Sequence, residues 1–125
     1  MNYVFIDSNK TIGGIEALFI ELAKYLSKKN NIYFIVHNNN SAYIKNLENI
    51  SSIKFVVRTV YKPVEYFSDN DIKIEKQSML ENFDNCEDYH VIVPYFDALQ
   101  FAMAVFGDRN NFKLMHLWAH PQSWC

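Results

Sequence analysis

Apolar and polar stretches follow one another along the chain in a pattern that predicts strands separated by helices. Residues 3–7 form a run that is apolar up to its last residue, as expected for a strand that is buried on both faces of a sheet. Further short strands are predicted over residues 32–37, 53–57, 90–93 and 112–117. Because strands and helices alternate, the connections predict right-handed βαβ units and a parallel sheet. The sequence therefore predicts an α/β fold, a Rossmann-like three-layer domain with about five strands, as a single domain over residues 1–125.

The best-defined helix is predicted directly after Gly13-Gly14. Apolar residues recur there at spacings of three and four, as on one face of an amphipathic helix. The expected buried face consists of Ile15, Leu18, Phe19, Leu22 and Leu26. A second, short helix is predicted over residues 42–48, after a turn at 38–41 that supplies its cap.

Two later helix predictions carry specific expectations. A helix over residues 73–83 is expected to bury Met79, Leu80 and Phe83, and it follows an irregular segment over 58–71. Residues 98–106 are apolar nearly all round, so we expect a buried helix. Asp97 is predicted to cap that helix and Gly107 to end it.

Composition narrows the class of protein. Half of the residues are hydrophobic and 16% are aromatic, which is too much apolar surface for a disordered tail. The formal net charge of −2 gives no reason to expect nucleic acid as a partner. Cys86 and Cys125 are too few for a disulfide framework, and Cys86 lacks the histidine partner of a catalytic nucleophile. With neither a signal peptide nor a membrane-spanning stretch in the sequence, we expect a cytoplasmic protein, with peripheral association with the inner membrane left open.

The turn between the first strand and the first helix is the first candidate for ligand binding. In doubly wound sheets, ligands bind beyond the carboxyl ends of the strands, and a helix N-terminus offers free N–H groups to anions. Gly13 and Gly14 would let a ligand approach the backbone there. The segment matches neither the three-glycine dinucleotide fingerprint nor a P-loop. Spacing alone leaves ligand contact and a merely flexible turn as equal alternatives.

Residues 11–26 read Thr-Ile-Gly-Gly-Ile-Glu-Ala-Leu-Phe-Ile-Glu-Leu-Ala-Lys-Tyr-Leu and directly follow the predicted first strand. This segment resembles the opening of GT-B-fold, family-4-type glycosyltransferases. In that family a Gly-Gly-small-Glu segment begins the first helix and a Leu-Ala-x-x-Leu run continues it. The predicted strand at 32–37 also falls where the family's second strand lies. The resemblance covers residues 1–37, and beyond them mainly the order of strands agrees.

The resemblance implies the N-terminal half of a bacterial enzyme that transfers a sugar from a nucleotide-sugar donor to a saccharide or lipid-linked acceptor, in cell-envelope polysaccharide synthesis. It implies no metal and no cofactor besides the donor substrate. Gly13 and Gly14 would face the donor phosphates. Glu16 matches the motif and is a candidate sugar contact, but a solvated first-turn carboxylate favoured by the helix dipole is the preferred interpretation. His120, at the exit of the fifth strand, and Trp118, which could stack on a sugar ring, are further candidate contacts.

Other polar residues near strand ends have plainer interpretations. His116 and His120 are four residues apart, and on a strand they would be roughly 13 Å apart, too far to share one metal ion. His37 and His90 flank strands and are predicted to be structural. Asp7 ends the first strand, where it either reaches the cleft or caps the following turn.

The family's second domain, which binds the donor, is not represented in this sequence. We therefore expect a truncated portion of a longer protein that is inactive alone and needs its C-terminal donor-binding domain as a partner. Missing strands should also leave an open sheet edge that invites self-association. The alternative is a non-catalytic α/β interaction or regulatory domain. A receiver domain is disfavoured, because the third strand ends in Val56-Val57-Arg58 instead of a phosphoacceptor aspartate.

Overall fold

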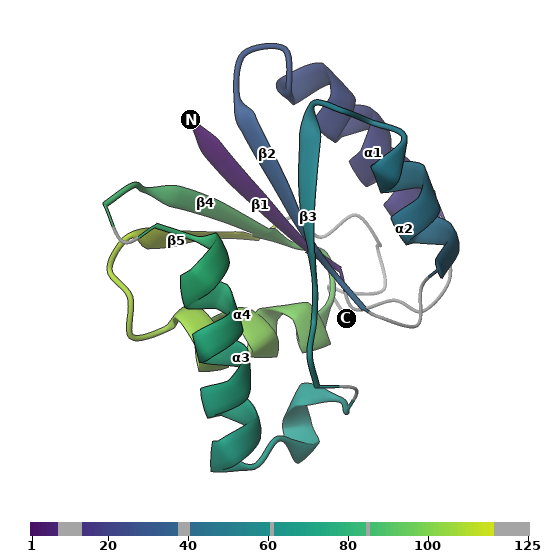
Figure 1. Cartoon of the computed structure of the whole chain (residues 1–125). Helices are drawn as coiled ribbons and strands as arrows, with labels where there is room; N and C mark the ends of the chain where they lie inside the picture. Colours follow the sequence, from purple (N-terminus) through teal and green to yellow (C-terminus); the bar gives the residue numbers. More distant parts are fainter. Residues whose placement is uncertain (8–13, 38–40, 61, 85, 117–125) are drawn as a thin grey trace.

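The protein folds around one sheet of five parallel strands in the order β3-β2-β1-β4-β5 (Figure 1). The computed structural model describes residues 1–7, 14–37, 41–60, 62–84 and 86–116. The strands are β1 (Asn2–Asp7), β2 (Asn31–Val36), β3 (Ile53–Val57), β4 (Tyr89–Val93) and β5 (Phe112–His116). All five predicted strands are confirmed, with ends that shift by about one residue; Leu117, the predicted end of the fifth, lies outside the described residues.

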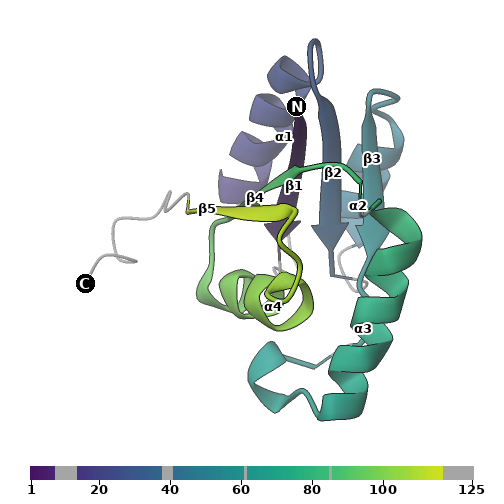
Figure 2. The same cartoon turned by 90° about the vertical axis from the view of Figure 1, so that its left-hand side faces the viewer.

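The helices cover both faces of the sheet and complete the predicted three-layer, Rossmann-like fold (Figures 1 and 2). Helices α1 (Gly14–Leu26) and α2 (Ser41–Glu48) pack on one face. Helices α3 (Asp69–Asn82) and α4 (Phe96–Phe106) pack on the other, together with the short 3₁₀ helix η1 (Val64–Tyr66). No helix within the described ranges is both long and apolar enough to cross a membrane.

Strand β1 lies at the centre of the sheet and contributes to both halves of the core. Val4 and Ile6 pack beneath α3 and α4, whereas Phe5 packs beneath α1 and α2 and stacks on Phe34 with ring centroids 5.0 Å apart. Successive side chains of a strand point to opposite faces, so a central strand that is covered on both sides needs apolar residues at every position. This requirement explains the continuous apolar run at the start of the sequence.

Neutral amide side chains hold together the amino edge of the sheet, where the strands begin. Asn31 donates its side-chain N–H to the Asn2 side-chain oxygen at 2.9 Å, and Asn2 donates to the Asp88 carbonyl at 3.1 Å. On the other side, Asn111 donates to the carbonyls of Asp84 and Glu87. These bonds tie the first residues of the strands to the loops that enter them.

Helix α1 turns a different face to the core from the one that its leucines predict. Among the side chains of α1 whose burial is described, those of Glu16, Phe19, Ile20 and Ala23 are buried, and they are spaced as one helical face. Phe19 is buried as expected, but Leu18 is 51% exposed, and Leu22 and Leu26 are only partly buried. The prediction was wrong for Leu18 because it placed only large apolar side chains on the buried face and therefore passed over a buried carboxylate. The side chain of Ile15 lies outside the described part of the helix.

The segment predicted to be irregular over 58–71 is more ordered than the sequence suggested. It contains η1, and α3 begins four residues earlier than predicted because Ser68 and Asp71 form a capping box. In that box the Ser68 side chain accepts from the Asp71 N–H, and the Asp71 carboxylate accepts from the Ser68 N–H. Met79 and Phe83 are buried as expected, but Leu80 is exposed because it lies one position off their face.

Helix α4 ends at Gly107 as predicted but begins earlier than the predicted Ala98. Its N-cap is Tyr95, so Asp97 lies inside the first turn and does not cap the helix. Phe96 and Met103 are 65% and 63% exposed, so α4 is not buried all round. Its core-facing side is nevertheless rich in fully buried apolar residues, namely Ala98, Phe101, Val105 and Phe106.

Candidate functional site at the carboxyl edge of the sheet

The direction in which the chain winds reverses between β1 and β4. From β1 the chain crosses through α1 to β2, whereas β4 lies on the other side of β1 and continues through α4 to β5. The loops that leave β1 and β4 therefore diverge to opposite faces at the carboxyl edge, which in doubly wound sheets is where ligands bind. Asp7, the last residue of β1, and Tyr95, which follows β4, lie at this switch point.

Two carboxylates and two phenols gather at the switch point, and we refer to Asp7, Glu16, Tyr43 and Tyr95 as the switch-point cluster. The first three of these side chains belong to residues with no solvent exposure. The Tyr95 hydroxyl donates to Glu16 Oε2 at 2.8 Å, which joins α1 to the loop between β4 and α4. Burial raises the pKa of Tyr43 far above its ordinary value, and the negative charges of Asp7 and then Glu16 raise it further. Tyr43 therefore stays a neutral phenol at every physiological pH.

The cluster corrects the expectation that Glu16 is a solvated carboxylate. Its side chain is buried in the first turn of α1, where the helix dipole favours a negative charge and the Tyr95 hydroxyl supplies a donor. A buried carboxylate without such partners would be strongly destabilising. Chemically, the arrangement fixes the beginning of α1 against the loop after β4, at the place where a ligand of this fold would lie.

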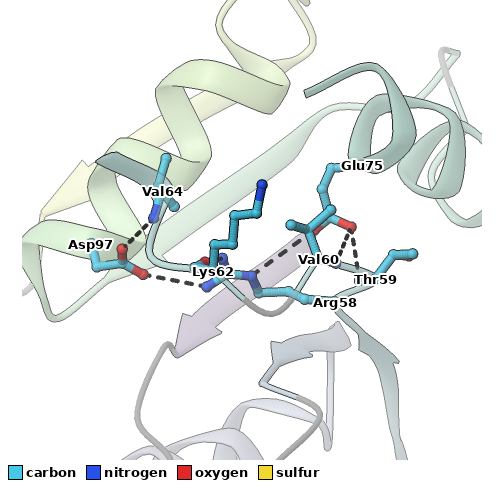
Figure 3. Close-up of polar contacts among 7 residues, drawn as sticks. All are labelled: Arg58, Thr59, Val60, Lys62, Val64, Glu75 and Asp97. Atoms are coloured by element: carbon cyan, nitrogen blue, oxygen red, sulfur yellow. Dashed lines mark hydrogen bonds and ion pairs between the residues drawn. The ribbon is translucent and has the colours of Figure 1, made fainter. Parts of the chain in front are cut away.

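A second polar cluster lies further along the same edge and is centred on Arg58, the residue after β3 (Figure 3). Together with Glu75 of α3 and Asp97 of α4 it forms the Arg58 cluster. Arg58 is 2% exposed; its Nη1 lies 3.3 Å from Asp97 Oδ2 and its Nε lies 3.9 Å from Glu75 Oε2. The guanidinium also lies over the Phe101 ring, 4.6 Å from its centroid. One cation thus links two carboxylates that come from different helices.

The carboxylates of the Arg58 cluster also bind the backbone between β3 and α3. Glu75 Oε1 accepts the N–H groups of Thr59 at 2.7 Å and Val60 at 3.3 Å (Figure 3). Asp97 Oδ1 accepts the Val64 N–H at 2.9 Å. The cluster therefore supplies hydrogen-bond partners to a segment that has little regular secondary structure, and it holds this segment against α3 and α4.

The residues proposed from the sequence as ligand contacts are only partly within the described structure. Gly14 is the first residue of α1, at the carboxyl end of β1. Gly13, Trp118 and His120 lie outside the described residues, as does the turn at 38–40, so their predicted roles stay predictions.

The other histidines and the cysteine weighed in the sequence occupy different places, and His37 lies at the carboxyl edge, directly after Val36, which pairs with Asp7. His37 is buried after β2, and His90 lies within β4 with its ring 5.7 Å from that of Tyr3. Cys86 is exposed, and hydrogen bonding with the Asp84 carboxylate raises the pKa of its thiol, which disfavours the reactive thiolate. In the part of the chain that the structure describes, no three histidine, cysteine or acidic side chains are grouped to hold a metal ion.

Sequence reasoning passed over four important residues, namely Tyr43, Arg58, Glu75 and Tyr95. A signal was present for Glu75, because Glu75, Met79 and Phe83 follow one another at intervals of four and share the buried face of α3. Arg58 directly follows an apolar strand and was used only to exclude a receiver domain. The tyrosines carried no such signal, because their partners are far away in sequence, as in the Tyr95–Glu16 bond.

Comparisons of this chain with models of protein families, with curated proteins and with solved structures find no match.

Proposed function

We propose that this chain is the amino-terminal, acceptor-side domain of a GT-B-type glycosyltransferase that uses a nucleotide sugar as donor and acts in cell-envelope polysaccharide synthesis. The observation that carries the proposal is the position of Glu16. The glutamate of the Gly-Gly-x-Glu segment is buried at the switch point and fixes the start of α1 beside the glycine turn. The residues that carry the resemblance therefore have a structural role at the edge where such folds bind ligands.

The geometry also bears on which part of a donor the turn could face. The N–H groups in the first turn of a helix attract anions, and Gly14 begins α1. Asp7 and Glu16 place two carboxylates beside the same turn, where they oppose a close anion. In this proposal the donor phosphates lie over the glycines on the side of the turn away from the two carboxylates, and the sugar hydroxyls of donor or acceptor lie on the other side. In this proposal His120 and Trp118 contact the sugars.

Catalysis would require groups from a second domain. Transfer of a sugar develops negative charge on the leaving nucleoside diphosphate, and stabilising that charge requires basic groups or helix N-termini aimed at it. The buried cation described at this edge, Arg58, is paired with Glu75 and Asp97. We therefore propose that the isolated chain binds acceptor weakly and transfers no sugar.

The alternative, a non-catalytic interaction domain, has one observation in its favour. An apolar groove lies between α4 and the end strand β5, and Met103 and Leu114 on its wall are 63% and 41% exposed. Such a surface would suit a protein contact. A further helix would also cover this groove if the sheet continued beyond β5. The groove alone therefore does not favour an interaction domain over a glycosyltransferase domain.

The first test is to sequence the source gene downstream of the codon for Cys125. We expect an in-frame second α/β domain with paired glutamates and basic cleft residues. A stop codon at that point would overturn the assignment of catalysis and leave the interaction domain.

The second test uses the protein encoded by the whole reading frame and measures release of nucleoside diphosphate from UDP-glucose, UDP-galactose and GDP-mannose with a crude lipid-linked acceptor. We expect Glu16→Gln to lower the rate at least tenfold, which corresponds to about 1.4 kcal/mol. Glu21→Gln is the matched control, because Glu21 lies on the same helix and is exposed beside Lys24. Equal rates for the two variants would contradict the role of Glu16. Turnover by residues 1–125 alone would contradict the need for a second domain.

A further inference from the structure

We propose that the Arg58 cluster is a positioning device for the switch-point cluster, and that it acts through the first turn of α4. Tyr95 and Asp97 are two residues apart at the start of that helix. Tyr95 reaches Glu16 of α1 across the edge of the sheet, while Asp97 is held from the opposite side by Arg58 and Val64. The inference concerns the geometry of the site and does not depend on which reaction the site serves.

Tyr95 is tied to α4 through its backbone and to α1 through its side chain. As the N-cap of α4 it makes no side-chain capping bond, and its hydroxyl donates to Glu16. Its backbone carbonyl accepts the Leu99 N–H at 3.0 Å, so the position of Tyr95 follows that of the first turn of α4. Any movement of this turn therefore also moves the Tyr95 hydroxyl, which donates to Glu16.

The first turn of α4 is itself held by charge. Asp97 Oδ2 lies 3.3 Å from Arg58 Nη1, and Asp97 Oδ1 accepts the Val64 N–H at 2.9 Å. Arg58 cannot follow a moving Asp97, because its guanidinium is paired with the buried Glu75 of α3 and its Nη2 donates to the Lys62 carbonyl at 3.3 Å. The rigid side of the arrangement is thus α3 and the residues after β3, and the dependent side is Tyr95.

The coupling should be sensitive because a hydrogen bond is a short-range contact. The Tyr95 hydroxyl lies 2.8 Å from Glu16 Oε2, and a shift of about 1 Å would take the two oxygens beyond bonding distance. We therefore infer that loss of Asp97 weakens the Tyr95–Glu16 bond although Asp97 contacts neither residue in the described structure. Asp97 is in this sense a positioning residue and not a catalytic one.

The test follows the carboxyl carbon of Glu16 by NMR in the chain labelled with ¹³C-glutamate, with the signal assigned by its loss in Glu16→Gln. Tyr95→Phe removes the hydroxyl and gives the shift of the Glu16 carboxylate without the Tyr95 bond. We expect Asp97→Ala to move the Glu16 signal in the same direction and at least half as far. Asp97→Asn retains an oxygen that can accept from Val64 but loses the charge paired with Arg58, so we expect its Glu16 signal to lie between those of wild type and Asp97→Ala.

The matched control is Asp108→Ala. Asp108 also pairs with a residue of α3, Lys76 at 3.0 Å, but this pair lies on the surface beyond the other end of α4. We expect the Glu16 signal of this variant to stay at its wild-type position. If Asp97→Ala does not fold, Arg58→Lys supplies the same test, because it keeps the charge but loses the planar fork. A Glu16 signal that is unmoved in folded Asp97→Ala or in folded Arg58→Lys would overturn the proposal, and so would an equal shift in Asp108→Ala.

Discussion

Replacing Arg58 with methionine removes the charge at the centre of the Arg58 cluster while keeping a side chain of similar reach. The variant leaves Glu75, whose side chain is 0% exposed, without the cation that lies beside it. Breaking a buried ion pair in this way costs about 3–5 kcal/mol. The Asp97 side chain is 30% exposed, so water can solvate its charge. Loss of its pairing with Arg58 should therefore add little to the loss of stability. We therefore expect the free energy of unfolding to fall by about 4 kcal/mol.

A loss of this size is a large part of the stability of a small domain, which is about 5–15 kcal/mol in total. The assay is urea denaturation followed by far-ultraviolet circular dichroism. With a slope of about 2 kcal/mol per molar urea, the midpoint should fall by about 2 M. Lys76→Met is the matched control, because it makes the same chemical change in the exposed pair with Asp108. An exposed pair of this kind contributes about 1 kcal/mol or less.

A double variant tests why Arg58→Met lowers the free energy of unfolding. Glu75→Gln in the Arg58→Met background removes the uncompensated charge, while its amide oxygen can still accept from Thr59 and Val60. We expect this double variant to regain about 2 kcal/mol. If Arg58→Met lies within about 1 kcal/mol of wild type, the idea that a buried charge is compensated here is refuted. If the double variant regains nothing, the loss belongs instead to the contact between Arg58 and the Phe101 ring.

Three further changes test other parts of the structure. Tyr95→Phe removes the hydrogen bond to the Glu16 carboxylate, and because bonds to charged groups are among the stronger ones, we expect a loss of about 1.5–3 kcal/mol in urea denaturation. Asp71→Asn should lower stability at neutral pH, because the Ser68 N–H lowers the pKa of Asp71 in the folded state. The difference in stability from wild type should shrink as the pH falls from about 4 through that lowered pKa. Thermal melts at a series of pH values would measure this difference. Phe83→Ala should cost about 3–5 kcal/mol in urea denaturation, because the ring is 1% exposed and touches four other aromatic rings.

Each of these expectations has a control within the chain. Tyr25 is 70% exposed, so Tyr25→Phe should match wild type; an equal loss in both tyrosine variants would contradict a specific role for Tyr95. Asp69 shares the first turn of α3 but takes no part in the capping box, so Asp69→Asn should lower stability at neutral pH less than Asp71→Asn does. Leu80→Ala lies beside Phe83 on an exposed face and should change stability little, and a loss as large as that of Phe83→Ala would contradict the packing described.

Most of the fold could be predicted from the sequence because it depends on local patterns. The strands were found by their apolar runs, and the parallel arrangement followed from the alternation of strands with helices. Errors appeared where a contact distant in sequence decides the outcome. Leu18 was expected to be buried, but the face of α1 is set by Glu16, whose partner Tyr95 is 79 residues away. No local pattern carries that information.

The position of the candidate site could be predicted from the sequence, but most of the residues that form it could not. Parallel strands place their carboxyl ends at one edge, so the turn after the first strand was a sound place to look. The residues that meet there come from α1, α2 and the loop after β4, and their side chains are brought together only by the packing of the two layers on the sheet. Asp97 was interpreted as a cap because an aspartate before an apolar helix is typical of one. Its carboxylate is instead drawn to Arg58, a partner from beyond β3.

The amide contacts at the other end of the sheet have a consequence for how the domain responds to acid. Asn2, Asn31 and Asn111 neither gain nor lose a proton over the pH range in which proteins unfold. The carboxyl edge depends on aspartates and glutamates, which acid neutralises. Acid strong enough to protonate carboxylates, about pH 4 for unperturbed groups, should therefore act first on the edge where a ligand would bind, while the amide contacts of the amino edge stay intact. Acid would thus change the site before it changed the rest of the fold.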